Sequence, residues 1–268
     1  MMRLAAFLLG VLVSAMCMVH AEIRKFSVTS ACLATPERVV VAVPDAKAPA
    51  EGWPTLYLLN GYLDNEEAWI KRLPLDSLAN ANSTIIICPD GRDSFYWDVD
   101  ESVCSGLKME RFITRDLVAM VDSMFATDKT SRSIAGYSMG GHGALYLAAR
   151  HPGMFKNVVA LSGAFDIEQL KAVSWIKVPS LLGPYDRRRW NAASVFAHMD
   201  SLVAHAPRIM LICGAADAFL PDSKRLHAEF DRHGVKHVYK VLPGDHHWRF
   251  WRKQMPALFD FINSDRRK

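Results

Sequence analysis

The sequence lacks the residue spacings by which most zinc sites are recognised. Its five cysteines include no C-x-x-C pair, and its histidines form no H-E-x-x-H motif. These spacings are typical of zinc centres because two ligands a few positions apart can reach one ion from a single turn of the chain. The motifs of the sequence therefore predict no metal site.

Long apolar runs, internal repeats and dense clusters of one charge are also scarce. The one apolar stretch of note, Leu4 to Val19, is shorter than the ~20 residues that a membrane-spanning helix needs. The net charge is only +4, and basic residues cluster only at 186–190 and 265–268. Scattered charge argues against a nucleic-acid partner. Without repeats or linkers, we expect one domain over residues 22–268.

The first residues have the composition of a secretory signal peptide. Arg3 precedes the apolar stretch, and small residues surround a possible cut after Ala21. We expect residues 1–21 to be removed and the mature protein to be secreted or periplasmic, with no membrane attachment after cleavage. An uncleaved anchor is the alternative.

Export would place the remaining cysteines in a compartment that permits disulfides. Cys88 and Cys213 lie in apolar, strand-like runs and are expected in the core. Cys32 and Cys104 lie in polar, loop-like stretches. A bridge between Cys32 and Cys104 is therefore a hypothesis.

Short β-rich runs dominate the chain and alternate with helical patterns from its middle onward. The first two runs lack a helix between them, which predicts antiparallel edge strands. The later alternation predicts strand–helix–strand units and a mostly parallel sheet. The predicted strands cover residues 23–30, 38–44, 55–61, 84–91, 131–138, 157–165, 208–217 and 237–247.

Apolar residues recur at helical spacing in residues 112–125, 226–230 and 248–262. These stripes predict helices that pack on the sheet. Pro256 predicts a kink or break near Met255, because proline lacks the N–H that an interior helical position needs.

The stretch Gly136-Tyr137-Ser138-Met139-Gly140 has the G-x-S-x-G pattern of a nucleophile elbow. It follows a predicted strand and precedes a small-residue helix, which is the context that such an elbow requires. Glycines 136 and 140 suit a turn too tight for side chains, and the Met139 N–H would face a developing oxyanion. A plain glycine-rich bend is the alternative.

A serine needs a base and an acid that orients the base. Asp217 ends one predicted strand, and His246 and His247 follow the last one, in the order that α/β-hydrolases use. Asp222 is a second candidate acid, although it is better placed to cap the following helix. Pattern alone does not separate His246 from His247. His142 is expected to pack or cap, and six other histidines are expected at the surface: His151, His198, His205, His227, His233 and His237.

The loop after the third predicted strand contains Asn60, Gly61 and Tyr62. It is placed to supply a second oxyanion donor, although an ordinary strand-ending turn would also favour Asn-Gly. Aromatic residues Trp69, Tyr96 and Trp97 lie near the expected pocket. They would suit an aryl or sugar face, and packing explains each of them equally well. Residues 165–190 are expected to form a cap over the site.

These motifs together resemble the esterase D-like α/β-hydrolases. The group contains S-formylglutathione hydrolases, short-chain acyl esterases, the feruloyl and acetylxylan esterases of carbohydrate esterase family one, and mycolyl transferases. The resemblance runs from about Arg38 to Ile262. The blocks that carry it are YLLNGYLDNEEAW, PDGRDSFYWD, FITRDLVAMVD, GYSMGGHGAL, CGAADAFLPDSKRLHAEF and PGDHHWRFW.

The resemblance implies an α/β-hydrolase fold, with a mostly parallel central sheet of about eight strands and helices on both faces. It implies Ser138 as nucleophile, Asp217 as orienting acid and His246 as base, because the family's glycine–x–histidine–x–tryptophan pattern places the base at His246. Tyr62 and Met139 become the backbone oxyanion donors. Asn60 is a departure, since the family often has histidine there.

We therefore expect a serine carboxylic-ester hydrolase that forms an acyl-enzyme and needs no metal or organic cofactor. Short-chain acyl esters, or feruloyl or acetyl esters of carbohydrates, are the expected substrates, with Gly61, Trp69, Tyr96 and Trp97 lining the binding site. An acyltransferase or peptidase of the same fold is one alternative. A hydrolase fold without catalysis that binds carbohydrate is another. The sequence leaves the oligomeric state open.

Overall fold

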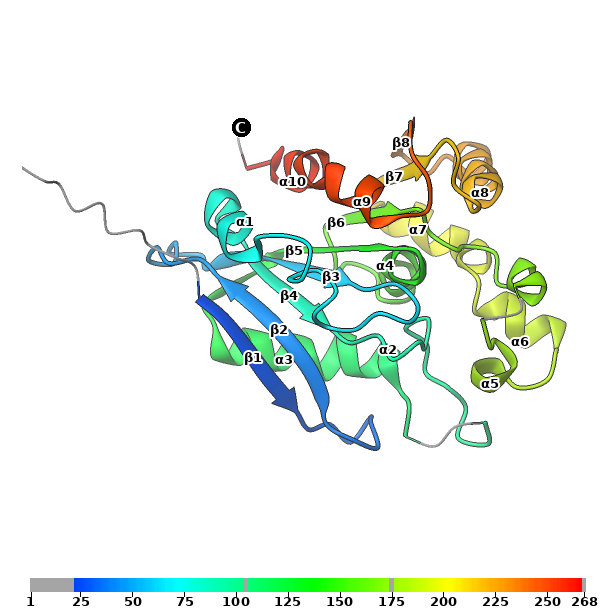
Figure 1. The fold of residues 1–268 in the computed structure, drawn as a ribbon, viewed down its shortest axis with the longest axis horizontal. Helices are drawn as coiled ribbons and strands as arrows, with labels where there is room; N and C mark the ends of the chain where they lie inside the picture. Colours follow the sequence, from blue (N-terminus) through cyan, green and yellow to red (C-terminus); the bar gives the residue numbers. More distant parts are fainter. Residues whose placement is uncertain (1–21, 104–105, 174–175, 267–268) are drawn as a thin grey trace, which may run out of the picture.

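A computed structural model describes residues 22–103, 106–173 and 176–266. Its centre is an eight-stranded sheet with the order β1-β2-β4-β3-β5-β6-β7-β8 (Figure 1). The strands are β1 Glu22–Val28, β2 Glu37–Val43, β3 Trp53–Leu59, β4 Ile85–Pro89, β5 Thr127–Tyr137, β6 Asn157–Leu161, β7 Arg208–Gly214 and β8 His237–Leu242. All eight predicted strands are present.

Strand direction is reversed at β2, which runs opposite to the other seven strands of the sheet. Strand β1 pairs antiparallel with β2, and β2 pairs antiparallel with β4. From β4 to β8 all neighbours are parallel. The predicted antiparallel edge and the mostly parallel sheet are therefore both confirmed. The parallel strands place their C-terminal ends at one edge of the sheet, where the site is built.

Helices cover both faces of the sheet, as predicted. One face packs on α1 (Leu75–Asn82), α9 (Trp248–Lys253) and α10 (Met255–Asn263). The other packs on α3 (Val118–Met124), α4 (Met139–Arg150), α7 (Met199–His205) and α8 (Leu220–His233). In Figure 1, α9 and α10 lie above the sheet and α3 lies below it. Burial on both faces explains why strands such as β3 and β4 read as continuous apolar runs.

Two of the predicted helices contain interruptions. The segment 112–125 contains the π-helical turn η1 (Phe112–Leu117) between α2 (Met109–Arg111) and α3. The C-terminal segment breaks between α9 and α10 at Gln254, and Pro256 stands in the first turn of α10. Proline is tolerated there because the first N–H groups of a helix have no intrahelical partner. The predicted break near Met255 is confirmed.

The chain between β6 and β7 forms short elements at one end of the sheet. They are η2 (Gln169–Ala172), α5 (Pro179–Leu182), α6 (Arg187–Ala192) and the 3₁₀ turn η3 (Val195–His198), followed by α7. Trp190 is 1% exposed and anchors α6 in the core. These elements include the stretch expected to form a cap.

Asp222 does not cap α8, contrary to the sequence-based expectation. It lies inside the first turn of α8, and its carboxylate accepts hydrogen bonds from the backbone N–H groups of Phe165 and Asp166. The carboxylate therefore ties α8 to the loop after β6. Burial raises the pKa of Asp222 to about 6.

The cysteines of the described part of the chain are free thiols. Cys88 and Cys213 are buried in strands, as expected. Cys32 is also free, and its sulfur accepts a hydrogen bond from Arg115, contrary to the disulfide hypothesis. Cys104 lies outside the described residues, as do residues 1–21 of the predicted signal peptide. Within the described ranges, no helix is both long and apolar enough to span a membrane.

The raised pKa of Asp222 predicts a pH dependence of stability. Its folded-state pKa of about 6 lies above the ordinary value of 3.8, so the folded state binds the proton more tightly. This stabilisation is complete below about pH 4 and is lost as the pH rises through about 6. From pH 7 to pH 4, the wild type should gain roughly 2–3 kcal/mol of unfolding free energy relative to Asp222→Asn, measured by urea denaturation. The exposed Asp200→Asn is the control, and parallel pH curves for wild type and Asp222→Asn would contradict the assignment.

Candidate active site

Ser138 lies in the turn between β5 and α4. Its backbone has φ 55° and ψ −120°, a region that residues other than glycine seldom adopt. The turn is held by a hydrogen bond from the Ser138 N–H to the Leu161 carbonyl. A Cβ at Gly140 would stand 2.6 Å from the Leu59 carbonyl oxygen, so only glycine allows α4 to start this close to β3. The local structure is therefore that of a nucleophile elbow.

Ser138, His246 and Asp217 meet at the C-terminal edge of the sheet. The His246 Nε2 lies 3.0 Å from the Ser138 Oγ, and the His246 Nδ1 lies 3.0 Å and 3.1 Å from the two Asp217 carboxylate oxygens. Each residue follows a different parallel strand, β5, β8 and β7 respectively. The structure thus brings together the three residues selected from the sequence, with His246 between Ser138 and Asp217 and within hydrogen-bond distance of both.

Asp217 is enclosed, and its side chain has no exposed surface. Its carboxylate also accepts a hydrogen bond from the Phe219 N–H at 2.8 Å. Burial is the largest single influence and acts to raise the pKa of Asp217. The hydrogen bond and the charge of His246, with the hydrogen bonds from Ser162 and the Phe219 N–H, together outweigh it, so the pKa is lowered. An ionised carboxylate at this position favours the imidazole tautomer that carries its proton on Nδ1 and presents the Nε2 lone pair to serine.

The imidazole of His246 packs against Trp251, which is itself held by Ser162. Neither Trp251 nor Ser162 was identified from the sequence as a site residue. The Trp251 ring meets the His246 ring edge-on, with centroids 4.9 Å apart. Its indole N–H donates to the Ser162 Oγ at 3.0 Å. Ser162 is 1% exposed and has a φ of 51°, so it is held rigidly after β6. Trp251 ends the block PGDHHWRFW, and Ser162 lies in the predicted strand 157–165. No local pattern marks either one as a site residue.

The loop after β3 is fixed by the Asn60 side chain. Its amide nitrogen donates to the carbonyls of Gly61 and Asp64, and its amide oxygen accepts from the Gly91 N–H and the Tyr96 hydroxyl. Both the amide nitrogen and the amide oxygen of Asn60 therefore have hydrogen-bond partners, and Asn60 holds the loop at a position where the family often has histidine. Gly61 and Tyr62 line the cavity beside Ser138. Met139 opens α4, where the first N–H groups lack intrahelical acceptors.

The cavity beside Ser138 has a volume of about 240 Å³. A polar cluster forms one side of it: Asp64 accepts from the Tyr137 hydroxyl at 2.5 Å and from the Trp248 indole N–H at 3.4 Å. The Arg72 guanidinium lies over the Trp248 ring, 4.4 Å from its centroid. Asp64 and Arg72 were not identified from the sequence, although Asp64 lies in the quoted loop block.

Three aromatic residues expected in the binding site lie instead in the core. Trp69 has no exposed surface and donates its indole N–H to the Leu59 carbonyl. Tyr96 is equally buried, and the indole N–H of Trp97 donates to the Ala193 carbonyl. The packing alternative is therefore correct for all three, because each places its ring in the core and pairs its polar atom internally.

The other histidines near the site have structural positions. His247 precedes α9, where its ring nitrogen accepts from the Arg249 N–H. It also lines the cavity beside Ser138, but the imidazole within hydrogen-bond distance of the Ser138 Oγ is that of His246. His142 is completely buried, and desolvation lowers its pKa to about 3. Its ring stacks on Tyr146. The expectation that His142 packs is confirmed.

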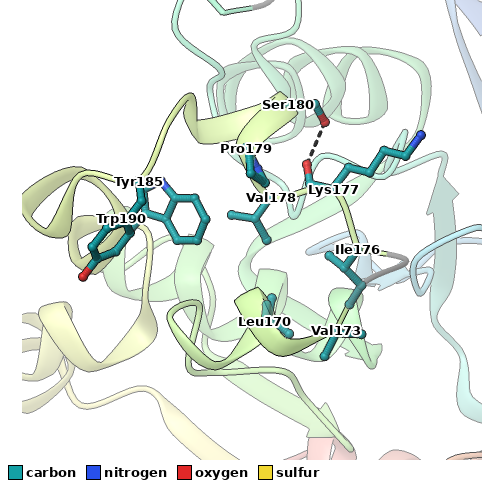
Figure 2. A pocket seen from close by; sticks show the side chains of 9 residues that line it. All are labelled: Leu170, Val173, Ile176, Lys177, Val178, Pro179, Ser180, Tyr185 and Trp190. Carbon is teal, nitrogen blue, oxygen red and sulfur yellow. Dashed lines mark hydrogen bonds between the residues drawn. The ribbon is translucent and has the colours of Figure 1, made fainter.

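A second, larger cavity of about 570 Å³ lies among the short elements after β6. Figure 2 shows its lining, which is mainly apolar and includes Leu170, Ile176, Val178 and the rings of Tyr185 and Trp190. The Lys177 N–H beside this cavity donates to the Tyr62 hydroxyl at 3.4 Å. Since Tyr62 also lines the cavity at Ser138, this contact lies between the two cavities.

Comparisons with known proteins agree with this geometry. An acetyl esterase of Caldicellulosiruptor saccharolyticus is 26% identical over 251 residues, covering 82% of this chain and 88% of the relative. The diacylglycerol acyltransferase/mycolyltransferase Ag85B of Mycobacterium avium is 26% identical, over 77% of this chain and 74% of the relative. The fluorophosphonate-binding serine hydrolase FphF of Staphylococcus aureus, solved with substrate bound, has a similar fold. Its TM-score is 0.83 at 20% identity, covering 90% of this chain and 98% of that one.

The family model named Esterase matches residues 30–262, which is most of the chain. The predicted α/β-hydrolase fold and the resemblance to the esterase D-like group are thereby confirmed. The protein is a member of the Esterase family and has the α/β-hydrolase fold.

Proposed function

We propose that the protein is a carboxylic-ester hydrolase in which Ser138 is the nucleophile, His246 the general base and Asp217 the orienting acid. The observation that carries this proposal is the unbroken hydrogen-bond chain from Ser138 Oγ through His246 to the buried Asp217 carboxylate. A serine hydroxyl attacks an ester only when a positioned base removes its proton. This chain supplies that base and its orienting group.

In the first step, Ser138 Oγ attacks the ester carbonyl while its proton passes to His246 Nε2. The backbone N–H groups of Met139 and Tyr62 stabilise the oxyanion, and His246 then protonates the departing alcohol. In the second step, His246 removes a proton from water, which attacks the acyl carbonyl. His246 then returns that proton to Ser138 Oγ as the acyl–Oγ bond breaks, which releases the acid and restores the serine. No step requires a metal or an organic cofactor.

The substrate proposed is a short-chain acyl ester, with acetyl esters of carbohydrates favoured. The small volume beside Ser138 supports a small acyl group. The half-buried rings of Tyr62 and Trp248 line that cavity, and aromatic rings suit the apolar face of a sugar. A feruloyl group would have to extend toward the second cavity, past the contact between Tyr62 and Lys177.

An acyltransferase activity is the second candidate, because the relative Ag85B carries that name. The chemistry differs only in the acceptor, since an alcohol in place of water would take the acyl group from Ser138. Adding a sugar or a simple alcohol to the ester assay and measuring the transfer product distinguishes the two activities.

We further propose that residues 1–21 direct export and that residues 22–268 form the catalytic domain. Glu22 pairs with Val43 in the ladder between β1 and β2, so the residues from Glu22 onward contribute to the sheet, which supports including them in the catalytic domain. N-terminal sequencing of the protein recovered from the culture medium or periplasm tests it.

Removal of the nucleophile should abolish turnover. Ser138→Ala is expected to lower kcat for p-nitrophenyl acetate by roughly 10⁴-fold or more, because serine and base act as a unit. The exposed Ser123→Ala should retain the wild-type rate. A Ser138→Ala enzyme with an unchanged rate would remove Ser138 from the mechanism.

Replacement of the acid should affect the rate with little effect on the fold. Asp217→Asn offers an amide donor where His246 needs an acceptor, which favours the wrong imidazole tautomer, so kcat should fall by roughly 10⁴-fold. Asp200→Asn is the matched control. Equal kcat values for Asp217→Asn and the control would exclude Asp217 as the orienting acid.

Acyl-chain preference tests the substrate proposal. With p-nitrophenyl acetate, butyrate and octanoate, kcat/KM should fall with chain length, by roughly tenfold or more from acetate to octanoate. Tyr62→Phe keeps the backbone donor but loses the hydroxyl that accepts from Lys177. It should therefore raise the ratio of methyl ferulate to acetate turnover. A wild-type enzyme that prefers octanoate or ferulate would refute the proposed specificity for short acyl groups.

A further inference from the structure

Two histidines lie side by side where α8 packs near the start of β8, whereas Ser138 lies at the opposite, C-terminal ends of the strands. His227 lies in α8, and His237 is the first residue of β8. The His227 Nδ1 lies 2.7 Å from the His237 Nε2. Asp231, one helical turn after His227, places its carboxylate 3.7 Å from the His227 Nε2. The ligand atoms of the three residues lie within 4.8 Å of one another.

We propose that His227 and His237 bind a divalent transition-metal cation, with Zn²⁺ as the expected ion, and that Asp231 orients His227. Two imidazole nitrogens are suited to zinc, nickel or copper, whereas magnesium and calcium require oxygen ligands. The site is separate from the esterase centre and takes no part in the proposed ester chemistry.

The hydrogen bonds of His237 leave a nitrogen available to a cation. Its Nδ1 lies 2.8 Å from the Val235 carbonyl oxygen, which can only accept. The proton therefore sits on Nδ1, and the Nε2 lone pair faces His227. A metal-bound histidine typically donates its other N–H to a backbone carbonyl or a carboxylate in this way.

His227 has the matching arrangement on its other side. Without a cation, its Nδ1–H donates to the His237 Nε2. For a cation to bind both nitrogens, they must move apart from 2.7 Å to about 3.3 Å, the span of two Zn–N bonds at a tetrahedral angle. The proton of His227 then lies on Nε2, on the side of the Asp231 carboxylate, which has to approach from 3.7 Å to accept it. Asp231 would then be the outer partner of His227, as the Val235 carbonyl is of His237.

Neighbouring rings restrict both imidazoles before a cation binds. Tyr239 stacks on His227 with centroids 4.2 Å apart, and Phe230 meets His237 edge-on at 5.0 Å. Ligands that are already oriented lose less entropy when they bind. An open cavity of about 490 Å³, whose lining includes both histidines, Tyr239 and Lys236, leaves room for water molecules as the remaining ligands.

A cation here would join the middle of α8 to the start of the edge strand β8. Along the chain, α8 and β8 lie between Asp217 and His246, the acid and the base of the proposed triad. The sequence motifs predicted no metal site because the two ligands belong to different elements and form no known spacing.

Zinc titration of the tag-free protein tests this site. Isothermal titration calorimetry with ZnCl₂ should detect a site that is lost, or weakened at least tenfold, in His227→Gln and His237→Gln. Asp231→Asn should weaken it by roughly tenfold. The control His233→Gln lies on the same helix and pairs with Glu229 instead, so it should bind zinc like the wild type. Zinc, but not MgCl₂, should raise the Tm of the wild type and this control, and not that of His237→Gln.

Crystals grown with ZnCl₂ provide a readout that needs no variant. An anomalous difference peak at the zinc edge between His227 Nδ1 and His237 Nε2 is expected. Absence of that peak, or a zinc affinity and Tm shift unchanged in His237→Gln, would overturn the proposal. Esterase activity measured separately distinguishes failure of this site from failure of the proposed function.

Discussion

The close approach of α4 to the strand-ends beneath it is the constraint on which the site depends. Glycine at position 140 lets the first turn of α4 contact the carbonyls of Leu59 and Asn60, and a Cβ at Gly136 would lie 2.5 Å from the Gly140 backbone. This packing forces the unusual backbone of Ser138 and aims its hydroxyl out of the sheet. It also sets the start of α4 beside the loop that contains Tyr62. One contact between backbones thus positions both Ser138 and the two backbone N–H groups proposed to bind the oxyanion.

The parallel sheet extends this constraint to the other catalytic candidates. Because parallel strands end at a common edge, residues after β5, β7 and β8 converge although more than a hundred positions separate the first from the last. Burial of Asp217 would by itself favour the neutral acid, and the hydrogen bonds from His246 and Phe219 keep it ionised. Trp251 then limits the motion of His246. Ser138, His246 and Asp217 each have a hydrogen-bond partner within this group, and a partly buried polar network is rigid only when its members are paired in this way.

The predictions about aromatic residues failed for a common reason. Trp69, Tyr96 and Trp97 each have a large apolar ring and one polar atom, so the sequence is compatible with either a binding face or a core position. Their burial is decided by which loops fold over them. Trp97, for instance, pairs with Ala193, which lies far along the chain beyond β6. The cavity at Ser138 is instead lined by Asp64, Arg72 and Trp248, which come from two distant segments.

The sequence by itself determined the elements and their order. Apolar runs, helical stripes and the G-x-S-x-G turn are local patterns, and they predicted the eight strands, the break near Met255, the elbow at Ser138 and the family. It also restricted the acid and the base to a few residues, since these must follow later strands. Only the tertiary structure decided what depends on contacts between distant segments: the buried role of Asp222, the size of the cavity and the meeting of His227 with His237. Such contacts depend on how helices and loops pack against the sheet, and that packing has no signature in any single stretch of sequence.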